Sequence, residues 1–115
     1  MTVDQALSEL LRISVEITHA AILDENGDVL GSTVVARTVG DVGSRLWQSA
    51  GGIATAYGDA KLDQIVVDAQ GGAVFAAGDG AHVIVALAER HPAVGLIFYD
   101  LRACLADAFA PEEPV

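Results

Sequence analysis

The chain has 115 residues, of which 52% are hydrophobic, so it is long enough to bury a core and too apolar to be disordered. Its 16 acidic and six basic residues give a net charge of −10, which argues against nucleic acid and anionic lipid as partners and favours a protein with a basic face. No apolar run approaches the roughly 18 to 20 residues of a membrane-spanning helix, and the opening Met-Thr-Val-Asp lacks the basic and apolar regions of a signal peptide.

The first elements predicted are a helix and a hairpin. Apolar residues at helical spacing predict a helix from Asp4 to Ile13, with Thr2 as its N-cap. Strands are predicted from Val15 to Leu23 and from Val29 to Arg37. Between them, the run Asp-Glu-Asn-Gly-Asp at 24–28 is typical of a hairpin turn, because Asn-Gly accepts the positive φ angles of a tight turn.

A second helix is predicted from Asp41 to Tyr57, where Gly58 and Asp59 end it. Steps of three, four and seven predict that its buried side carries Val39, Val42, Leu46, Ala50, Ile53, Ala54 and Tyr57. On this assignment Trp47 lies off the buried side, where its indole is available to a partner.

The remaining chain predicts three short strands and a last helix. The strands run from Leu62 to Ala69, from Ala73 to Ala77 and from His82 to Ala88, with glycine-containing turns between them. Pro92 is expected to open the helix, because its missing backbone donor costs little there. The buried face of this helix is predicted to carry Val94, Ile97, Phe98, Leu101, Leu105 and Ala108.

This order of elements predicts the fold class. Strands joined by hairpins are antiparallel, so a five-stranded, mainly antiparallel sheet is expected. Continuous apolar runs at 83–87 and 65–67 indicate strands covered on both faces, which three amphipathic helices can provide. We therefore expect an α+β, three-layer α/β/α sandwich in one domain over residues 1–110, followed by a disordered tail at 111–115.

At this point the chain resembles a known family, the Roadblock or dynein light chain family of small-GTPase regulators, which shares the profilin-like sandwich. The resemblance covers Leu7 to Phe109 and has three local signatures. The first is the turn at 24–28 followed by Val-Leu-Gly-Ser at 29–32, and the second is the glycine-rich run from Val67 to Gly80. The third is Val-Gly-Leu-Ile-Phe-Tyr-Asp-Leu-Arg at 94–102.

The resemblance implies an assembly state and a class of partner. Roadblock domains are usually homodimers, in which the strand after the middle helix pairs with its twin and the two middle helices pack side by side. Prokaryotic members resemble partners of Ras-like GTPases, acting as scaffolds or activators, and eukaryotic members serve in dynein or in nutrient-signalling scaffolds. We therefore expect a homodimer and a Ras-like small GTPase as partners of this chain.

The residues themselves favour such a surface. The strand at 62–69 would be an apolar edge, which needs a covering partner. Gly51 and Gly52 together cost the middle helix roughly 2 kcal/mol against alanine, which is explained if another backbone approaches closely, although the helix could instead break at Gly51. The residues expected at the dimer or partner interface are Arg45, Trp47, Gln48, Gly51, Ile53, Ala54, Tyr57, Ile65 and Val67.

No catalytic, metal or cofactor site is predicted. His19, His82 and His91 have no metal-ligand spacing and are interpreted as core or turn residues. The Asp-x-Asn-x-Asp of the turn lacks the glycine and glutamate of a calcium loop, and the glycines at 71–80 match no phosphate-binding motif. Ser44 and Ser49 have no neighbouring base in the sequence.

Cysteine and arginine are the other residue types considered for a chemical role. Cys104, the single cysteine, permits no intrachain disulfide, which fits a reducing cytoplasm, and a small core filler is the favoured interpretation. Arg37 and Arg45 could neutralise transition-state charge in a partner's site, but solvated charges are favoured for both.

The preferred hypothesis is a non-catalytic, homodimeric regulator or scaffold of a Ras-like small GTPase in the cytoplasm. A nucleotide-independent dimeric adaptor is the alternative. A small-molecule sensor is the third hypothesis, since a profilin-like sandwich can host ligand pockets. The sequence leaves open which GTPase is bound, whether the effect is activation, inhibition or tethering, and whether dimers form tetramers.

Overall fold

The computed structural model describes residues 2–33, 37–56, 62–69, 71–89 and 93–110. Its elements follow the predicted order of helix, two strands, helix, three strands and helix. They are α1 (Val3–Ile13), β1 (Ile17–Asp24), β2 (Val29–Ser32), α2 (Arg37–Ala56), β3 (Gln64–Ala69), β4 (Gly72–Gly78), β5 (His82–Ala88) and α3 (Val94–Ala108). The predicted tail at 111–115 and Pro92 lie outside the described residues.

Local chemistry fixes the beginning of α1 and the first turn. Thr2 and Gln5 form a reciprocal capping box, in which the Gln5 N–H donates to Thr2 Oγ1 at 3.1 Å, so the predicted N-cap is confirmed. Asp24 Oδ1 accepts the N–H groups of Asn26 at 2.8 Å and Asp28 at 3.0 Å. Gly27 has a φ of 87°, which only glycine adopts without strain, and the predicted hairpin turn is confirmed.

The second strand is shorter than predicted. β2 ends at Ser32, whereas the sequence predicted strand as far as Arg37. Thr33 makes the last links to β1, because its N–H donates to Ala20 O at 2.9 Å and its hydroxyl accepts the Ala20 N–H at 3.0 Å. Arg37 already belongs to α2, so the helix begins four residues before the predicted Asp41.

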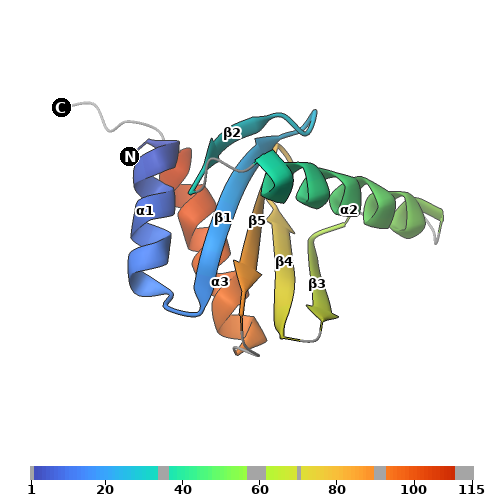
Figure 1. Cartoon of the computed structure of the whole chain (residues 1–115). Helices are drawn as coiled ribbons and strands as arrows, with labels where there is room; N and C mark the ends of the chain where they lie inside the picture. The colour runs from blue at the N-terminus through green and yellow to red at the C-terminus, as the bar shows by residue number, and fades with distance from the viewer. Residues whose placement is uncertain (1, 34–36, 57–61, 70, 90–92, 111–115) are drawn as a thin grey trace.

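All described strand pairs are antiparallel, and the sheet order is β2-β1-β5-β4-β3. Helices α1 and α3 pack together on one face of the sheet, and α2 crosses the other face (Figure 1). The predicted three-layer α/β/α sandwich is therefore confirmed. In the part of the chain that the structure describes, none of the helices combines the length and apolar character needed to cross a membrane.

Two apolar clusters fill the spaces between the layers. The larger lies between the sheet and the α1–α3 pair, where Phe75 meets Phe98 edge to face with ring centroids 5.5 Å apart. The smaller lies under α2 and contains Leu23, Ala76, Val83 and Val85. Together these clusters hold the sheet between its two helical layers.

Burial differs between the two strands that were predicted to be covered on both faces. Residues 83–86 of β5 are buried, as predicted for a central strand. The prediction is wrong for β3, because Val66 is 44% exposed and Val67 is 39% exposed. The physical reason is position: β3 is an edge of the described sheet, while α2 packs mainly over β1 and β5.

The buried side of α2 also differs from the prediction. Val42 is 51% exposed and Ile53 is 63% exposed, so these two residues do not face the core. Instead, Gly43 lies against Val85, and Trp47 packs on the cluster beneath the helix. Helix and sheet approach so closely here that the innermost residue is a glycine. The side chain of Val39 and all of Tyr57 lie outside the described residues.

On α3 the predicted face is largely confirmed. Ile97, Phe98, Leu101 and Leu105 are buried. Val94 is an exception: it is 45% exposed because it lies in the first turn, at the outer end of the helix.

The α2 glycines provide a matched pair of predictions. A Cβ built on Gly43 would lie 2.4 Å from Cγ2 of the stiff, buried Val85, whereas a Cβ on Gly51 meets no described heavy atom within 4 Å. We expect Gly43→Ala to lower the free energy of unfolding by about 1–3 kcal/mol through overpacking. Gly51→Ala should raise it by up to about 1 kcal/mol through helix propensity.

Urea denaturation of the monomeric chain measures the free energy of unfolding for both variants. Gly52→Ala is the matched control, because a Cβ at Gly52 likewise meets no described atom within 4 Å. If Gly43→Ala proved as stable as Gly51→Ala, the close packing of α2 on β5 would be wrong.

Candidate partner-binding surface

The exposed edge of β3 presents apolar side chains on both faces of the sheet. The register pairs Ile65 with Ala76 and Val67 with Val74, which both lie on the face that α2 crosses. Val66 pairs with Phe75 and therefore lies on the opposite face, towards α3. The two strand residues predicted for pairing, Ile65 and Val67, thus share a face with α2.

Arg102 of α3 fixes the start of β3. Its Nη2 donates to Gln64 Oε1 at 2.8 Å and lies 3.5 Å from Asp63 Oδ2. Both contacts join the last helix to the edge of the sheet. They position β3 as an edge strand that is held in place at its first residue.

The outer side of α2 is the second part of the surface. Arg45, Gln48 and Ile53 are exposed on it, and Ala54 is half-buried. The helix continues through Gly51 and Gly52 to Ala56, so the alternative of a break at Gly51 is wrong. Thr55 Oγ1 donates to Gly51 O at 2.9 Å, and the open space above Gly51 leaves the backbone accessible to another chain.

The position of Trp47 differs from the prediction. The sequence placed it off the buried side of α2, but the indole packs against the cluster of Leu23, Ala76, Val83 and Val85. A Cβ built on Gly78 of β4 would lie 2.7 Å from Trp47 Cζ2, which shows how closely the ring approaches the sheet. Trp47 is only partly buried, so its outer edge still contributes to the surface.

A groove of about 480 Å³ begins at this edge of the indole. It lies where the β1–β2 turn and the β4–β5 turn meet α2, and the pairing of Asp24 with His82 brings the two turns together. The groove is lined by Leu23, Asp24, Glu25, Gly27, Ser44, Trp47, Gln48, Gly51, Thr55, Leu62, Gly78, Gly80, Ala81, His82 and Val83.

Sequence analysis did not predict this groove. Its parts come from segments far apart in the chain, and only the fold brings them together. The signal that could have indicated it is the turn composition: Gly27 and Gly78 permit the close approach of Ser44 and Trp47, and Gly80 leaves open space beside them.

The β4–β5 turn forms one firm wall. Asp79 Oδ1 accepts the N–H groups of Ala81 at 2.9 Å and His82 at 2.7 Å, and the imidazole of His82 stacks on Phe109 with centroids 3.5 Å apart. Burial by itself raises the pKa of Asp79, but the hydrogen bonds from Ala81 and His82 outweigh it and lower the pKa below its usual value. His82 is the first residue of β5, and its N–H group helps to close the preceding turn, while His91 lies outside the described residues.

The remaining reactive groups form no obvious site. Within the described ranges, no three His, Cys, Asp or Glu side chains are placed to hold a metal ion. The side chain of Arg37 lies outside the description, and Arg45 is exposed on α2. Thr18 is used structurally, since its hydroxyl donates to Leu87 O at 3.1 Å.

Cys104 is buried in the core, as predicted for a small filler, and its thiol donates to Ala6 O at 3.4 Å. Burial, with a smaller contribution from Asp107, raises the pKa of the thiol to about 12. At pH 8 the thiolate fraction is then on the order of 10⁻⁴, so we expect modification by a disulfide reagent to be slow in the folded chain and fast in urea.

The sign of the pH dependence follows from the raised pKa. An unfolded thiol titrates near pH 8.5, so the contribution of Cys104 to stability is complete below about pH 8 and is lost as the pH rises towards 12. Urea midpoints between pH 7 and pH 10 for the wild type and Cys104→Ala measure this. An equal dependence of the urea midpoint on pH in the wild type and in Cys104→Ala would contradict this loss of stability.

No protein-family model and no curated protein matches the sequence of this chain. Its fold, however, matches solved structures. A Roadblock/LC7 domain from Streptomyces avermitilis has a TM-score of 0.81 at 18% identity, over 93% of this chain and 94% of that domain. MglB of Myxococcus xanthus has a TM-score of 0.75 at 13% identity, over 89% of this chain and 87% of its own.

Profilin IB of Acanthamoeba castellanii is also similar, with a TM-score of 0.62 at 16% identity, over 92% of this chain and 94% of its own. The profilin-like sandwich that the resemblance to the Roadblock family implied is therefore confirmed. The likenesses span nearly the whole chain, and the Roadblock structures superpose better than the profilin. The chain thus has the fold of the Roadblock/LC7 domains.

Proposed function

We propose that this chain is a non-catalytic, homodimeric regulator or scaffold that binds a Ras-like small GTPase in the cytoplasm. The observation that carries the proposal is the exposed apolar edge of β3. Val67 is exposed there and lies on the sheet face that α2 crosses, and a Cβ built on Gly51 of that helix meets no described atom within 4 Å. A second copy paired to β3 would extend the sheet and bring the two α2 helices side by side.

The exposed side chains and backbone groups of β3 support the proposed dimer. Exposed β-branched residues on an edge strand form a template for another strand, and pairing satisfies the backbone groups of both edges. A solved MglB structure is described as having a tetrameric arrangement, and it covers 90% of this chain with a TM-score of 0.76 at 15% identity. Assembly is thus known for one chain of this shape, and β3 is the edge that we propose for this chain.

The fold and the resemblance of the sequence to Roadblock domains support the GTPase as the partner. Paired α2 helices would form a continuous surface that includes Arg45, Gln48 and Ile53 from each copy, with Ala54 and the end of the helix towards Tyr57 beside them. Binding by this surface repositions residues of the partner and needs no catalytic group from the chain itself.

Affinity capture in two nucleotide states tests the proposal. The purified chain is immobilised and exposed to lysate of its own cells with either a non-hydrolysable GTP analogue or GDP, and bound proteins are identified by mass spectrometry. We expect a small GTPase to be enriched in one state, and its purified form to bind the chain directly. A partner set that ignores the nucleotide would instead favour the dimeric adaptor.

An empty eluate from a folded bait would refute both protein-binding functions. The sensor hypothesis would then be tested by thermal stabilisation with metabolites, because a ligand that binds only the folded chain raises its melting temperature.

A further inference from the structure

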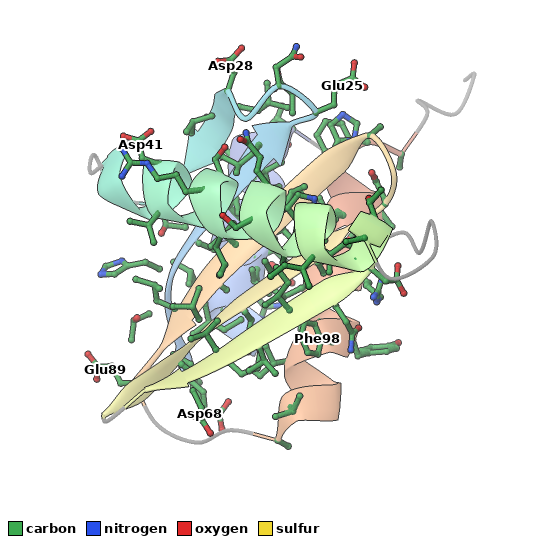
Figure 2. The ribbon with its side chains drawn as sticks, turned by 90° about the vertical axis from the view of Figure 1, so that its right-hand side faces the viewer. Glu25, Asp28, Asp41, Asp68, Glu89 and Phe98 are labelled. Atoms are coloured by element: carbon green, nitrogen blue, oxygen red, sulfur yellow. The ribbon has the colours of Figure 1, made fainter. Side chains whose placement is uncertain are left out.

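The groove beside Trp47 combines an apolar interior with an acidic rim. Leu23, Trp47, Leu62 and Val83 provide apolar lining, and Asp24 and Glu25 lie on the β1–β2 turn at its mouth. No lysine or arginine is among the lining residues in the described part of the chain. Figure 2 shows Glu25 and Asp28 gathered at this end of the sheet, with Asp68 and Glu89 at the opposite end.

Two carboxylates at this end of the sheet are held by hydrogen bonds. The N–H groups of Asn26 and Asp28 both donate to Oδ1 of Asp24, which holds this side chain against its own backbone. Asp79, on the adjoining β4–β5 turn, is fixed by the N–H groups of Ala81 and His82. Together with the exposed Glu25, these carboxylates give this end of the sheet a negative potential that attracts a cation.

The shape of the groove selects for a side chain with an apolar stem. A Cβ built on Gly51 or Gly80 would meet no described atom within 4 Å, so the groove has room for further atoms at these two positions. A partner segment lying along α2 could therefore extend one long residue past Gly51 towards Glu25. Lysine and arginine have such stems, with a charge at the tip.

Arginine fits better than lysine for two reasons. Its planar guanidinium stacks on an indole, and it can donate two hydrogen bonds to one carboxylate. Trp47 supplies the indole, and Asp24 and Glu25 supply the carboxylates. The net charge of −10 adds long-range attraction for a basic segment.

We propose that this groove binds an arginine-bearing segment of a partner protein, with the stem on Trp47 and Val83 and the guanidinium at Asp24 and Glu25. This site goes beyond the proposed function, because it does not depend on whether the partner is a GTPase. Its charge preference makes the groove a specificity determinant: a partner with an acidic residue at this position is rejected.

The experiment uses capped peptides and the single tryptophan of the chain. The probe is a short acetylated and amidated peptide with a central arginine between two leucines. The matched peptide carries citrulline, which keeps the shape and removes the charge. We expect a saturable change of Trp47 fluorescence with the arginine peptide, at a dissociation constant at least about tenfold below that of the citrulline peptide.

Amide NMR signals locate the binding. The signals of Gly27, Gly51, Gly78 and Gly80 should shift on addition of the arginine peptide, since all four residues line the groove. Those of Gly71, in the β3–β4 turn, and Gly95, on α3, should not. Shifts confined to the second pair would overturn the proposal.

Charge-neutral variants test the carboxylates without removing the fold. Glu25→Gln changes an exposed residue, and Asp24→Asn keeps the Oδ1 acceptor of the turn. Each should weaken the arginine peptide by about fivefold or more and leave the citrulline peptide unchanged. Glu16→Gln is the control, because this exposed acid precedes β1, at the end of the strand opposite to Asp24.

Three outcomes would overturn the site. The first is equal affinity for arginine and citrulline peptides, and the second is binding of a free arginine derivative as tight as that of the peptide, which would indicate a small-molecule site. The third is binding of the arginine peptide to the Val67→Asp variant but not to the wild type. This result would mean that a second copy occupies the groove of the wild type. None of these results depends on the nucleotide-state capture, so the two proposals fail separately.

Discussion

Replacing Val67 by aspartate is expected to convert the proposed dimer into a monomer. In the single chain this side chain is 39% exposed at the sheet edge, so a carboxylate there remains hydrated and the fold is kept. In a pair joined at β3 each copy would bury one uncompensated charge. Because such a charge costs about 3–5 kcal/mol, the dissociation constant should rise by at least about a hundredfold.

Sedimentation velocity over a concentration series measures this change, and circular dichroism verifies that the variant is folded. The matched control is Val29→Asp on β2, the other edge of the described sheet, where the valine is 40% exposed. This control should remain dimeric. A dimeric Val67→Asp chain beside a monomeric Val29→Asp chain would move the interface to β2.

Replacing Trp47 by alanine is expected to lower the free energy of unfolding by about 2–4 kcal/mol, somewhat less than for a fully buried aromatic residue. The indole covers Leu23, Val83 and Val85 and lies against Gly78, so truncation leaves a cavity between α2 and the sheet. Trp47→Phe should retain most of the stability because it fills part of that space.

Urea denaturation followed by far-ultraviolet circular dichroism makes the measurement, since the variants lack the fluorescent indole. Both variants are compared in the dissociated state, so that loss of a partner does not enter the result. The sequence-based assignment of Trp47 as a surface anchor predicts unchanged stability of the single chain and only a loss of affinity. Unchanged stability in Trp47→Ala would therefore falsify the inward packing.

Sequence reasoning succeeded where local chemistry decides the structure. The capping box at Thr2 and the turn at 24–28 depend on neighbours a few residues apart, so their patterns are visible in one dimension. The layer arrangement also followed, because the order of elements and the apolar run in β5 restrict how three helices can cover one sheet.

Sequence reasoning failed where the structure depends on the close approach of a helix and a strand. On α2, hydropathy favoured Val42 and Ile53 as core residues, yet the helix rests on the sheet through Gly43 and Trp47. A glycine carries almost no hydrophobic signal, although it is the residue that permits the shortest separation between helix and strand. The four-residue spacing of Gly43 and Trp47 was the available signal, since residues at this spacing share one face of a helix.

The candidate surface was predictable only in part. The edge position expected for the strand at 62–69 is confirmed, and the exposure of Arg45 and Gln48 agrees with their choice as surface residues. The groove could not be foreseen, because its walls come from segments around residues 25, 48 and 80 that meet only in the folded chain. Tyr57 lies outside the described residues, so its place at the interface stays a prediction.

The two edges of the sheet differ in a way that limits the size of any assembly. β2 has four residues, and its pairing with β1 is interrupted by a shift in register after Ile22. Short, irregular strands are poor templates for further strands. Two copies joined through β3 would therefore turn only β2 outwards at each end (Figure 1), and growth of the sheet would stop there. The proposed pairing at β3 would therefore be self-terminating, which would leave one strand available for assembly without the growth of fibres.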